Sequence, residues 1–311
     1  MSKFSLIFVE DKFKITNKQN KKIMRQQETG VVYATTGDYA RGTVVAYHHK
    51  PSPIKLNKAK KSDVKGLKPK ERERLILEDG TDEVVSNYTI GFEVEKNELH
   101  RHSVREYELF CGFERDSSCG YEAVTHILPL LPAGTWRTKV FDMFHKAERI
   151  IDDRYSPSDK RCGGHITVGV DNMDGAQLKA AMRPYCGILY AMWRNRLANT
   201  YCCGDRQMID SWGSTKYQVA YVKGYVLEFR IPSRFDSVRQ MMRRYELFYE
   251  LIDYSVNVKG KHESFLKKIK PIVLSMYNGD EAKVNEIMKL AKHFQKYILT
   301  GERHEDIRAF V

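Results

Sequence analysis

The sequence lacks any uninterrupted apolar run long enough to cross a membrane, and its mean hydropathy is −0.53. A membrane-spanning helix needs about 20 predominantly apolar residues, so no membrane span is expected. The short apolar run near the N-terminus is broken by Glu10 and Asp11, which argues against a secretory signal. We therefore expect a cytoplasmic protein without a membrane partner.

Cysteine is also scarce, with six residues and no C-x-x-C pair among them. This spacing argues against a zinc ribbon or a thioredoxin-type redox site, and we expect reduced, structural thiols. The chain has neither a G-x-x-x-x-G-K-[ST] loop nor a G-x-G-x-x-G loop. The sequence therefore offers no glycine-rich phosphate loop to hold a nucleotide.

What the sequence does have is 311 residues and an excess of positive charge, a formal +12. Residues 1–80 hold +9 of it, with 18 basic and 9 acidic side chains. We predict a small β-rich element over 1–54, a Lys-rich linker or loop over 55–80 and one large domain over 81–311. Basic runs attract polyanions, so an arm for nucleic acid is the alternative to a plain solvated linker.

Hydrophobic periodicity predicts an α+β core in the large domain. Strands are expected at 88–96, 163–170 and 225–232, with two more strands and a turn within 109–132. Helices are expected at 138–152, 175–199, 235–255 and 281–299.

Charged residues occur inside several of these strands. Glu93 and Glu95 are two residues apart and so share a strand face, as do Glu228 and Arg230, and His165 lies in the otherwise apolar segment GGHITVGV. Clustered carboxylates repel one another unless a cation offsets them, and Mg²⁺ prefers oxygen ligands. The pattern therefore indicates metal-assisted phosphoryl chemistry; the alternative is the solvated face of a half-exposed antiparallel sheet.

Five segments in order carry a family resemblance: GFEVE, E-R-D-S-S-x-G-Y-E-A-V-T, GGHITVG, RNRLANTYC, and KYQVA followed by VLEFRIPS. Over residues 88–250, about half the chain, they resemble the amidoligase family. That family comprises carboxylate–amine ligases with the glutamine synthetase and glutamate–cysteine ligase fold. The resemblance implies an antiparallel sheet funnel flanked by helices, with ATP at one end, the acceptor carboxylate at the other and Mg²⁺ between them.

The resemblance also implies roles for individual residues. The metal ligands would be Glu93, Glu95, Glu114, Asp116 and Glu228. The nucleotide would be bound by His165, Arg194 and Lys216, and the catalytic residues would be Arg230, Arg196 and Glu122. One departure is Thr167, which stands where the family has the second histidine of its G-x-H-x-H strand.

The function implied is an ATP- and Mg²⁺-dependent ligase that forms an amide or isopeptide bond through an acyl phosphate. Its substrates would be amino acids, peptides or proteins. Such ligases occur in phage and mobile-element contexts, so the compartment would be the host cytoplasm if the chain is phage-encoded. The alternative is an inactive ligase-fold protein that acts as a basic binding or structural component, on nucleic acid or within a phage assembly.

Overall fold

The computed structural model describes residues 88–99, 104, 106–107, 109–133, 135–170, 173–199, 201–202 and 217–300, together with four short strands nearer the N-terminus. At its centre lies an open antiparallel sheet in the strand order β10-β11-β9-β5-β7-β6, with the short β8 also paired to β5. The strands are β5 (Tyr88–Lys96), β6 (Phe110–Asp116), β7 (Gly120–Thr125), β8 (Leu128–Pro129), β9 (Ile166–Val170), β10 (Ala220–Lys223) and β11 (Val226–Phe229).

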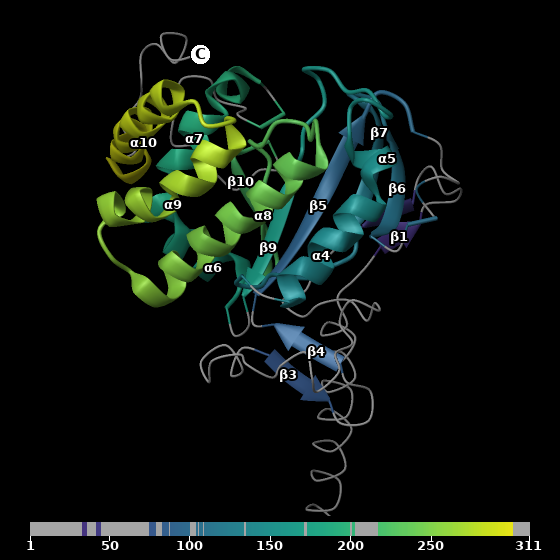
Figure 1. Ribbon diagram of the computed structural model, residues 1–311, viewed down its shortest axis with the longest axis horizontal. Helices are drawn as coiled ribbons and strands as arrows, with labels where there is room; N and C mark the ends of the chain where they lie inside the picture. Colours follow the sequence, from purple (N-terminus) through teal and green to yellow (C-terminus); the bar gives the residue numbers. More distant parts are fainter. Residues whose placement is uncertain are drawn as a thin grey trace, which may run out of the picture.

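Helices pack against one face and one end of this sheet (Figure 1). They are α4 (Thr135–Lys146), α5 (Glu148–Ile151), α6 (Gly175–Met182), α7 (Gly187–Met192), α8 (Val238–Asp253), α9 (His262–Met276) and α10 (Glu281–Thr300), with the short helices η4 (Arg183–Tyr185), η5 (Arg194–Ala198) and η6 (Tyr254–Val258). The predicted mixture of helices and antiparallel strands is confirmed at this level.

The two faces of the sheet differ in chemistry because successive side chains of a strand point to opposite sides. The even-numbered positions of β5 enter an aromatic core under α4 and α8, where Phe92 meets Phe144 edge-on at 5.8 Å. Phe229 of β11 packs in the same way against Phe248 of α8 at 5.2 Å. Burying such rings stabilises a fold by about 2 kcal/mol each, so this face holds the sheet together. The opposite face carries the polar residues.

The expected single helix over 175–199 is wrong. The chain there forms α6, η4, α7 and η5 in succession, and the first break falls at Pro184 within η4. Proline has no backbone N–H to donate and its ring clashes with the preceding turn, so the α-helical hydrogen bonds cannot continue through it. The break allows η5 to bring Arg196 back towards the polar face of the sheet.

Two further strand pairs lie in the N-terminal part, β1 (Tyr33–Thr35) with β2 (Gly42–Val44) and β3 (Leu75–Glu78) with β4 (Glu83–Ser86). The β3–β4 pair spans the predicted boundary between residues 80 and 81, whereas residues 55–74 of the Lys-rich segment lie outside the described part. Among the helices that the structure describes, none combines the length and the apolar character needed to cross a membrane.

Candidate functional site

Cross-strand register brings acidic residues from several strands onto the polar face of the sheet. Glu95 of β5 pairs with Glu122 of β7, and Glu122 pairs in turn with Glu114 of β6. On the other side of β5, Gly91 pairs with Thr167 of β9, which pairs with Glu228 of β11. Strands far apart in sequence therefore present their polar positions in adjacent rows.

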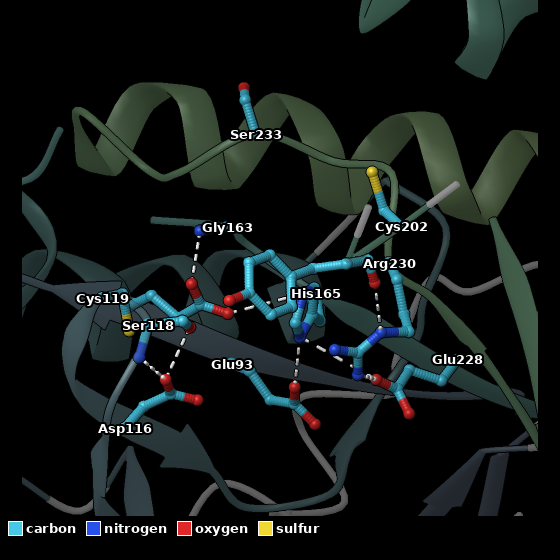
Figure 2. A network of polar contacts seen from close by, with 12 residues as sticks. Glu93, Asp116, Ser118, Cys119, Gly163, His165, Cys202, Glu228, Arg230 and Ser233 are labelled. Carbon is cyan, nitrogen blue, oxygen red and sulfur yellow. Dashed lines mark hydrogen bonds and ion pairs between the residues drawn. The ribbon is translucent and has the colours of Figure 1, made fainter. Parts of the chain in front are cut away.

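Glu93, His165 and Glu228 form the centre of this face, the Glu93–His165–Glu228 cluster (Figure 2). Nδ1 of His165 lies 2.6 Å from Oε2 of Glu93 and 3.8 Å from Oε1 of Glu228. One ligand atom from each residue lies within 4.8 Å of the others, and all three residues are buried. Two carboxylate oxygens and one imidazole nitrogen at this spacing could hold a divalent metal ion.

The other ring nitrogen of His165 faces a different carboxylate. Nε2 lies 3.4 Å from Oε1 of Glu95, whose second oxygen accepts a hydrogen bond from the backbone N–H of Gly163 at 2.5 Å. Nδ1 lies within hydrogen-bond distance of Glu93, so without a metal this nitrogen donates to that carboxylate; with a metal at Nδ1, the proton would be on Nε2, where Glu95 could accept it. This arrangement is typical of metal-binding histidines, which donate their second N–H to a carboxylate.

Two cations approach the same carboxylates. Nζ of Lys223, at the end of β10, forms an ion pair with Oε2 of Glu228 and lies 3.8 Å from Oε1 of Glu93. Nη1 of Arg230, directly after β11, donates to Oε1 of Glu228 at 2.6 Å. These charges offset part of the repulsion between the buried carboxylates.

The same charges shift the pKa values of the cluster. Burial raises the pKa of Glu93, but the charge of Lys223 and the hydrogen bond from His165 lower it further, so it lies well below its usual value. Burial lowers the pKa of Lys223, yet Glu93 and Glu228 raise it above the usual value; Glu228 and Glu93 do the same for Arg230. Near neutral pH the site is therefore a set of full charges, with Glu93 ionised and both cations protonated.

Arg196 lies against the cluster and has unused donors. Arg196 is 5% exposed, and neither its Nε nor its Nη1 has a hydrogen-bond partner among the residues that the structure describes. Its Nη2 is directed at the carbonyl of Arg230 at 3.5 Å, and a Cβ atom on Gly163 would lie 2.9 Å from that nitrogen. A buried guanidinium with free donors is suited to bind a carboxylate or a phosphate.

Other predicted site residues lie outside the cluster. Asp116 accepts hydrogen bonds of 2.5 Å from the backbone N–H and the hydroxyl of Ser118, which fixes the turn between β6 and β7. Arg194 forms an ion pair of 2.8 Å with Glu286 of α10, away from the polar face of the sheet. The side chain of Glu114 and the whole of Lys216 lie outside the described residues.

Sequence reasoning missed Lys223 and Gly163. Lys223 ends a strand just before Gly224, a position typical of an exposed hairpin end. The signal that could have identified it is that Lys223 lies two residues after Tyr221, and so on the same strand face, and Tyr221 pairs with Glu228. Gly163 is required because its missing side chain leaves room for Arg196, His165 and Glu95. A glycine pair before a buried strand was the available signal. The chain matches no protein-family model, and no curated protein resembles it significantly.

Proposed function

We propose that this protein is an ATP-dependent carboxylate–amine ligase whose divalent metal binds at the Glu93–His165–Glu228 cluster. The observation that carries the proposal is the placement of two buried carboxylates around Nδ1 of His165, with Glu95 behind Nε2. The open antiparallel sheet, with its polar face free of α4 and α8, is consistent with the funnel that the family resemblance implies.

The residues present fit a divalent ion. Glu93 and Glu228 would supply oxygen ligands and His165 a nitrogen, while Glu95 would orient the imidazole and not bind the metal itself. Because Mg²⁺ strongly prefers oxygen ligands, a site with one nitrogen favours Mn²⁺ over Mg²⁺ in affinity. When bound with ATP, the metal would neutralise phosphate charge during transfer of the phosphoryl group to a substrate carboxylate.

The basic residues have complementary tasks in this proposal. Arg196, with free Nε and Nη1, would bind an oxyanion of the substrate carboxylate or of the transferred phosphate. Arg230 is held to Glu228 and is 17% exposed, so it can reach a bound anion while it remains paired. Lys223 would neutralise Glu93 and Glu228 until the metal replaces it. The substrates would be a carboxylate and an amine from amino acids, peptides or proteins.

A second candidate is an inactive protein of this fold that acts as a binding component. The observation in its favour is that Lys223 and Arg230 already neutralise Glu228 without a metal ion. In this case the carboxylates and cations form a closed network that stabilises the sheet, and the protein would act through its basic N-terminal part. The two candidates differ in whether divalent metal binds at the cluster.

The test of activity is hydroxamate formation. The full chain is incubated with ATP, hydroxylamine and a panel of amino acids and peptides, with Mg²⁺ or Mn²⁺, and hydroxamate and ADP are measured. Glu93→Gln and Glu228→Gln should each lower the rate at least about 100-fold, because each replaces an anionic ligand of the proposed metal with a neutral amide, and that metal would neutralise the transferred phosphate. Glu98→Gln, at an exposed position directly after β5, is the matched control and should retain full activity.

Formation of ADP and hydroxamate by the parent chain, with loss in both cluster variants, supports the ligase. Formation of AMP in place of ADP would contradict it, because AMP indicates transfer of adenylate and not of phosphate. Equal rates in Glu228→Gln and Glu98→Gln would show that the cluster takes no part in the reaction.

A further inference from the structure

A polar cavity lies on the other side of the segment that leads into β9. It has a volume of about 340 Å³ and is bordered by α7, η5, α8 and the facing ends of α9 and α10. Its lining includes Trp193, Arg194, Arg244, Tyr277, Lys283 and Glu286. We call it the Arg244 cavity. Gly163 faces the cluster, whereas a Cβ atom on the next residue, Gly164, would lie 2.9 Å from Nη1 of Arg244. Consecutive residues of an extended strand face opposite sides, so the cavity and the cluster are separate sites.

Arg244 is a fully buried cation, and no carboxylate of the described residues neutralises it by direct contact. Its guanidinium donates to the carbonyls of Ser233 and Arg234 and to the side chain of Gln240. The rings of Phe235 and Trp193 lie against it at 4.4 Å and 5.1 Å. Burial lowers the pKa of Arg244 to about 9, the direction expected for a charge removed from water without a paired anion. Within the described part of the chain, its Nε has no hydrogen-bond partner.

The rest of the lining adds to the positive charge. Lys283 lies over the ring of Tyr277 at 4.7 Å, and Arg194 forms its 2.8 Å ion pair with Glu286 at the same cavity. Three cations and one carboxylate leave an excess of two positive charges. A phosphate monoester carries about −1.5 to −2 charges at neutral pH, which matches this excess better than a monoanionic carboxylate.

The size of the Arg244 cavity and its apolar lining indicate what kind of organic group the phosphate is attached to. A cavity of about 340 Å³ is at the lower end of the range for small-molecule sites and is far larger than one phosphate group. The ring of Tyr277 and the side chains of Met192 and Met276 provide apolar surface beside the cations. We propose that the Arg244 cavity binds the phosphate monoester of a small organic molecule. This inference does not depend on the ligase activity or on a metal ion.

The test uses phenyl phosphate as the probe, measured by calorimetry with the full chain in EDTA so that no metal site is occupied. Inorganic phosphate, benzoate and phenol are the comparison probes. Lys283→Ala and Arg194→Ala should each weaken phenyl phosphate binding at least about five-fold, the usual scale for losing one charged contact near a surface. Lys289→Ala, an exposed lysine on α10 that does not line the cavity, is the matched control and should leave binding unchanged.

Glu286→Gln should have the opposite effect on the affinity for phenyl phosphate. It removes the only carboxylate among the cavity residues that the structure describes and releases Arg194, so phenyl phosphate should bind at least about three-fold more tightly. A merely structural surface ion pair would not produce tighter binding when it is broken. Phenyl phosphate should also bind more tightly than inorganic phosphate, since the phenyl ring adds apolar contact, and more tightly than benzoate or phenol.

Three results would overturn the inference. The first is no measurable binding of phenyl phosphate at about 10 mM, well above the concentration that a specific small-molecule site requires. The second is binding that Lys283→Ala and Glu286→Gln leave unchanged. The third is equal binding of benzoate and phenyl phosphate, which would assign the cavity to carboxylates. None of these results bears on hydroxamate formation, so failure here and failure of the ligase proposal are distinguishable.

Discussion

The two nitrogens of His165 face different carboxylates, and this asymmetry determines what each neighbour contributes. Nδ1 faces Glu93 and Glu228, whereas Nε2 faces Glu95. Glu95 is also held by the N–H of Gly163, so its position is fixed independently of any ligand. At the scale of single residues, we therefore propose that Glu95 orients the imidazole, and that Glu93 and Glu228 would exchange their present contacts with His165, Lys223 and Arg230 for a metal ion.

Glu95→Gln tests this division of roles. The amide keeps the shape of the side chain but loses the negative charge that would stabilise the proton on Nε2 of His165 when Nδ1 binds a metal. Mn²⁺ affinity should fall about 10- to 100-fold, the usual effect of changing such an orienting group. Titration of Mn²⁺ into Glu95→Gln and Glu98→Gln provides the comparison, and equal affinities would show that Glu95 has no orienting role.

Lys223→Met tests whether the lysine and the metal compete for one position. Removing the ammonium group leaves Glu93 and Glu228 buried with less compensation, so the variant in EDTA should lose about 3 kcal/mol of unfolding free energy. Mn²⁺ should restore the lost stability and should bind more tightly than it does to the parent chain. Urea unfolding with and without Mn²⁺ measures both effects; a loss that Mn²⁺ does not repair would favour the closed charge network.

Among the elements, the extended segment before β9 separates the cluster from the Arg244 cavity. A Cβ atom on Gly163 would meet only side-chain atoms, whereas one on Gly164 would lie 2.5 Å from the backbone oxygen of Ser233. Gly163 and Ser233 also form an isolated β-bridge. Side-chain ends can shift to relieve a contact, but a paired backbone cannot, so the two glycines should respond differently to the same substitution.

Gly163→Ala should therefore affect Mn²⁺ binding more than the stability of the fold. Gly164→Ala should affect the stability of the fold more than Mn²⁺ binding. We expect Gly163→Ala to weaken Mn²⁺ binding at least about ten-fold at a cost of about 1 kcal/mol in stability. Gly164→Ala should cost about 3 kcal/mol or more, as expected for overpacking against fixed backbone. Calorimetric melting and Mn²⁺ titration of both variants measure the two quantities, and similar melting temperatures would contradict the distinction.

Helix α9 contains a histidine that should make the stability of the fold pH-dependent. Burial, and then the charge of Lys292, lower the pKa of the half-buried His262 to about 4, and no described residue forms a hydrogen bond with its Nε2. Between about pH 4 and 6.5 the unfolded chain binds more protons than the folded chain at this residue. The stability that the neutral ring contributes is therefore present above pH 6.5 and is lost as the pH falls towards 4.

The measurement is the unfolding free energy at pH 7 and pH 5 for the parent chain and for His262→Gln. The parent should lose about 1 to 2 kcal/mol more than the variant over this interval, allowing for solvent screening of a half-exposed ring. Because all other titrating groups are shared, the difference isolates His262. An identical loss in the two chains would show that His262 does not contribute.

Sequence patterns were sufficient to predict some of the helices and strands but not others. Alternation in YTIGFEVEK predicted β5 and placed Glu93 and Glu95 on one face, because the period of a strand is independent of its surroundings. Helix α9 was missed, since its exposed lysines and Pro271 weaken the apolar period although Phe265, Leu266, Ile269 and Val273 are buried. Pro184 had the opposite effect, because a regular apolar pattern concealed a break in the backbone.

At the scale of the whole molecule, the sequence could predict that charged strand residues converge but not how they are compensated. The structure brings Glu93 and Glu228 together with His165, a residue that the family resemblance assigned to the nucleotide and not to the metal. Hairpin register and helix packing determine how the other charged residues are paired. Lys223 pairs with Glu228, Asp116 accepts hydrogen bonds within its own turn, and Arg194 pairs with Glu286 of α10. These long-range contacts leave no periodic signal in the chain.

Mn²⁺ binding by the full chain, followed by electron paramagnetic resonance, tests the central claim most directly. We expect one tightly bound Mn²⁺ per chain, retained in Glu98→Gln and lost or weakened at least about 100-fold in Glu93→Gln and Glu228→Gln, with circular dichroism showing that all variants are folded. Absence of Mn²⁺ binding to the parent chain at millimolar concentration, or equal binding by Glu228→Gln and Glu98→Gln, would contradict it.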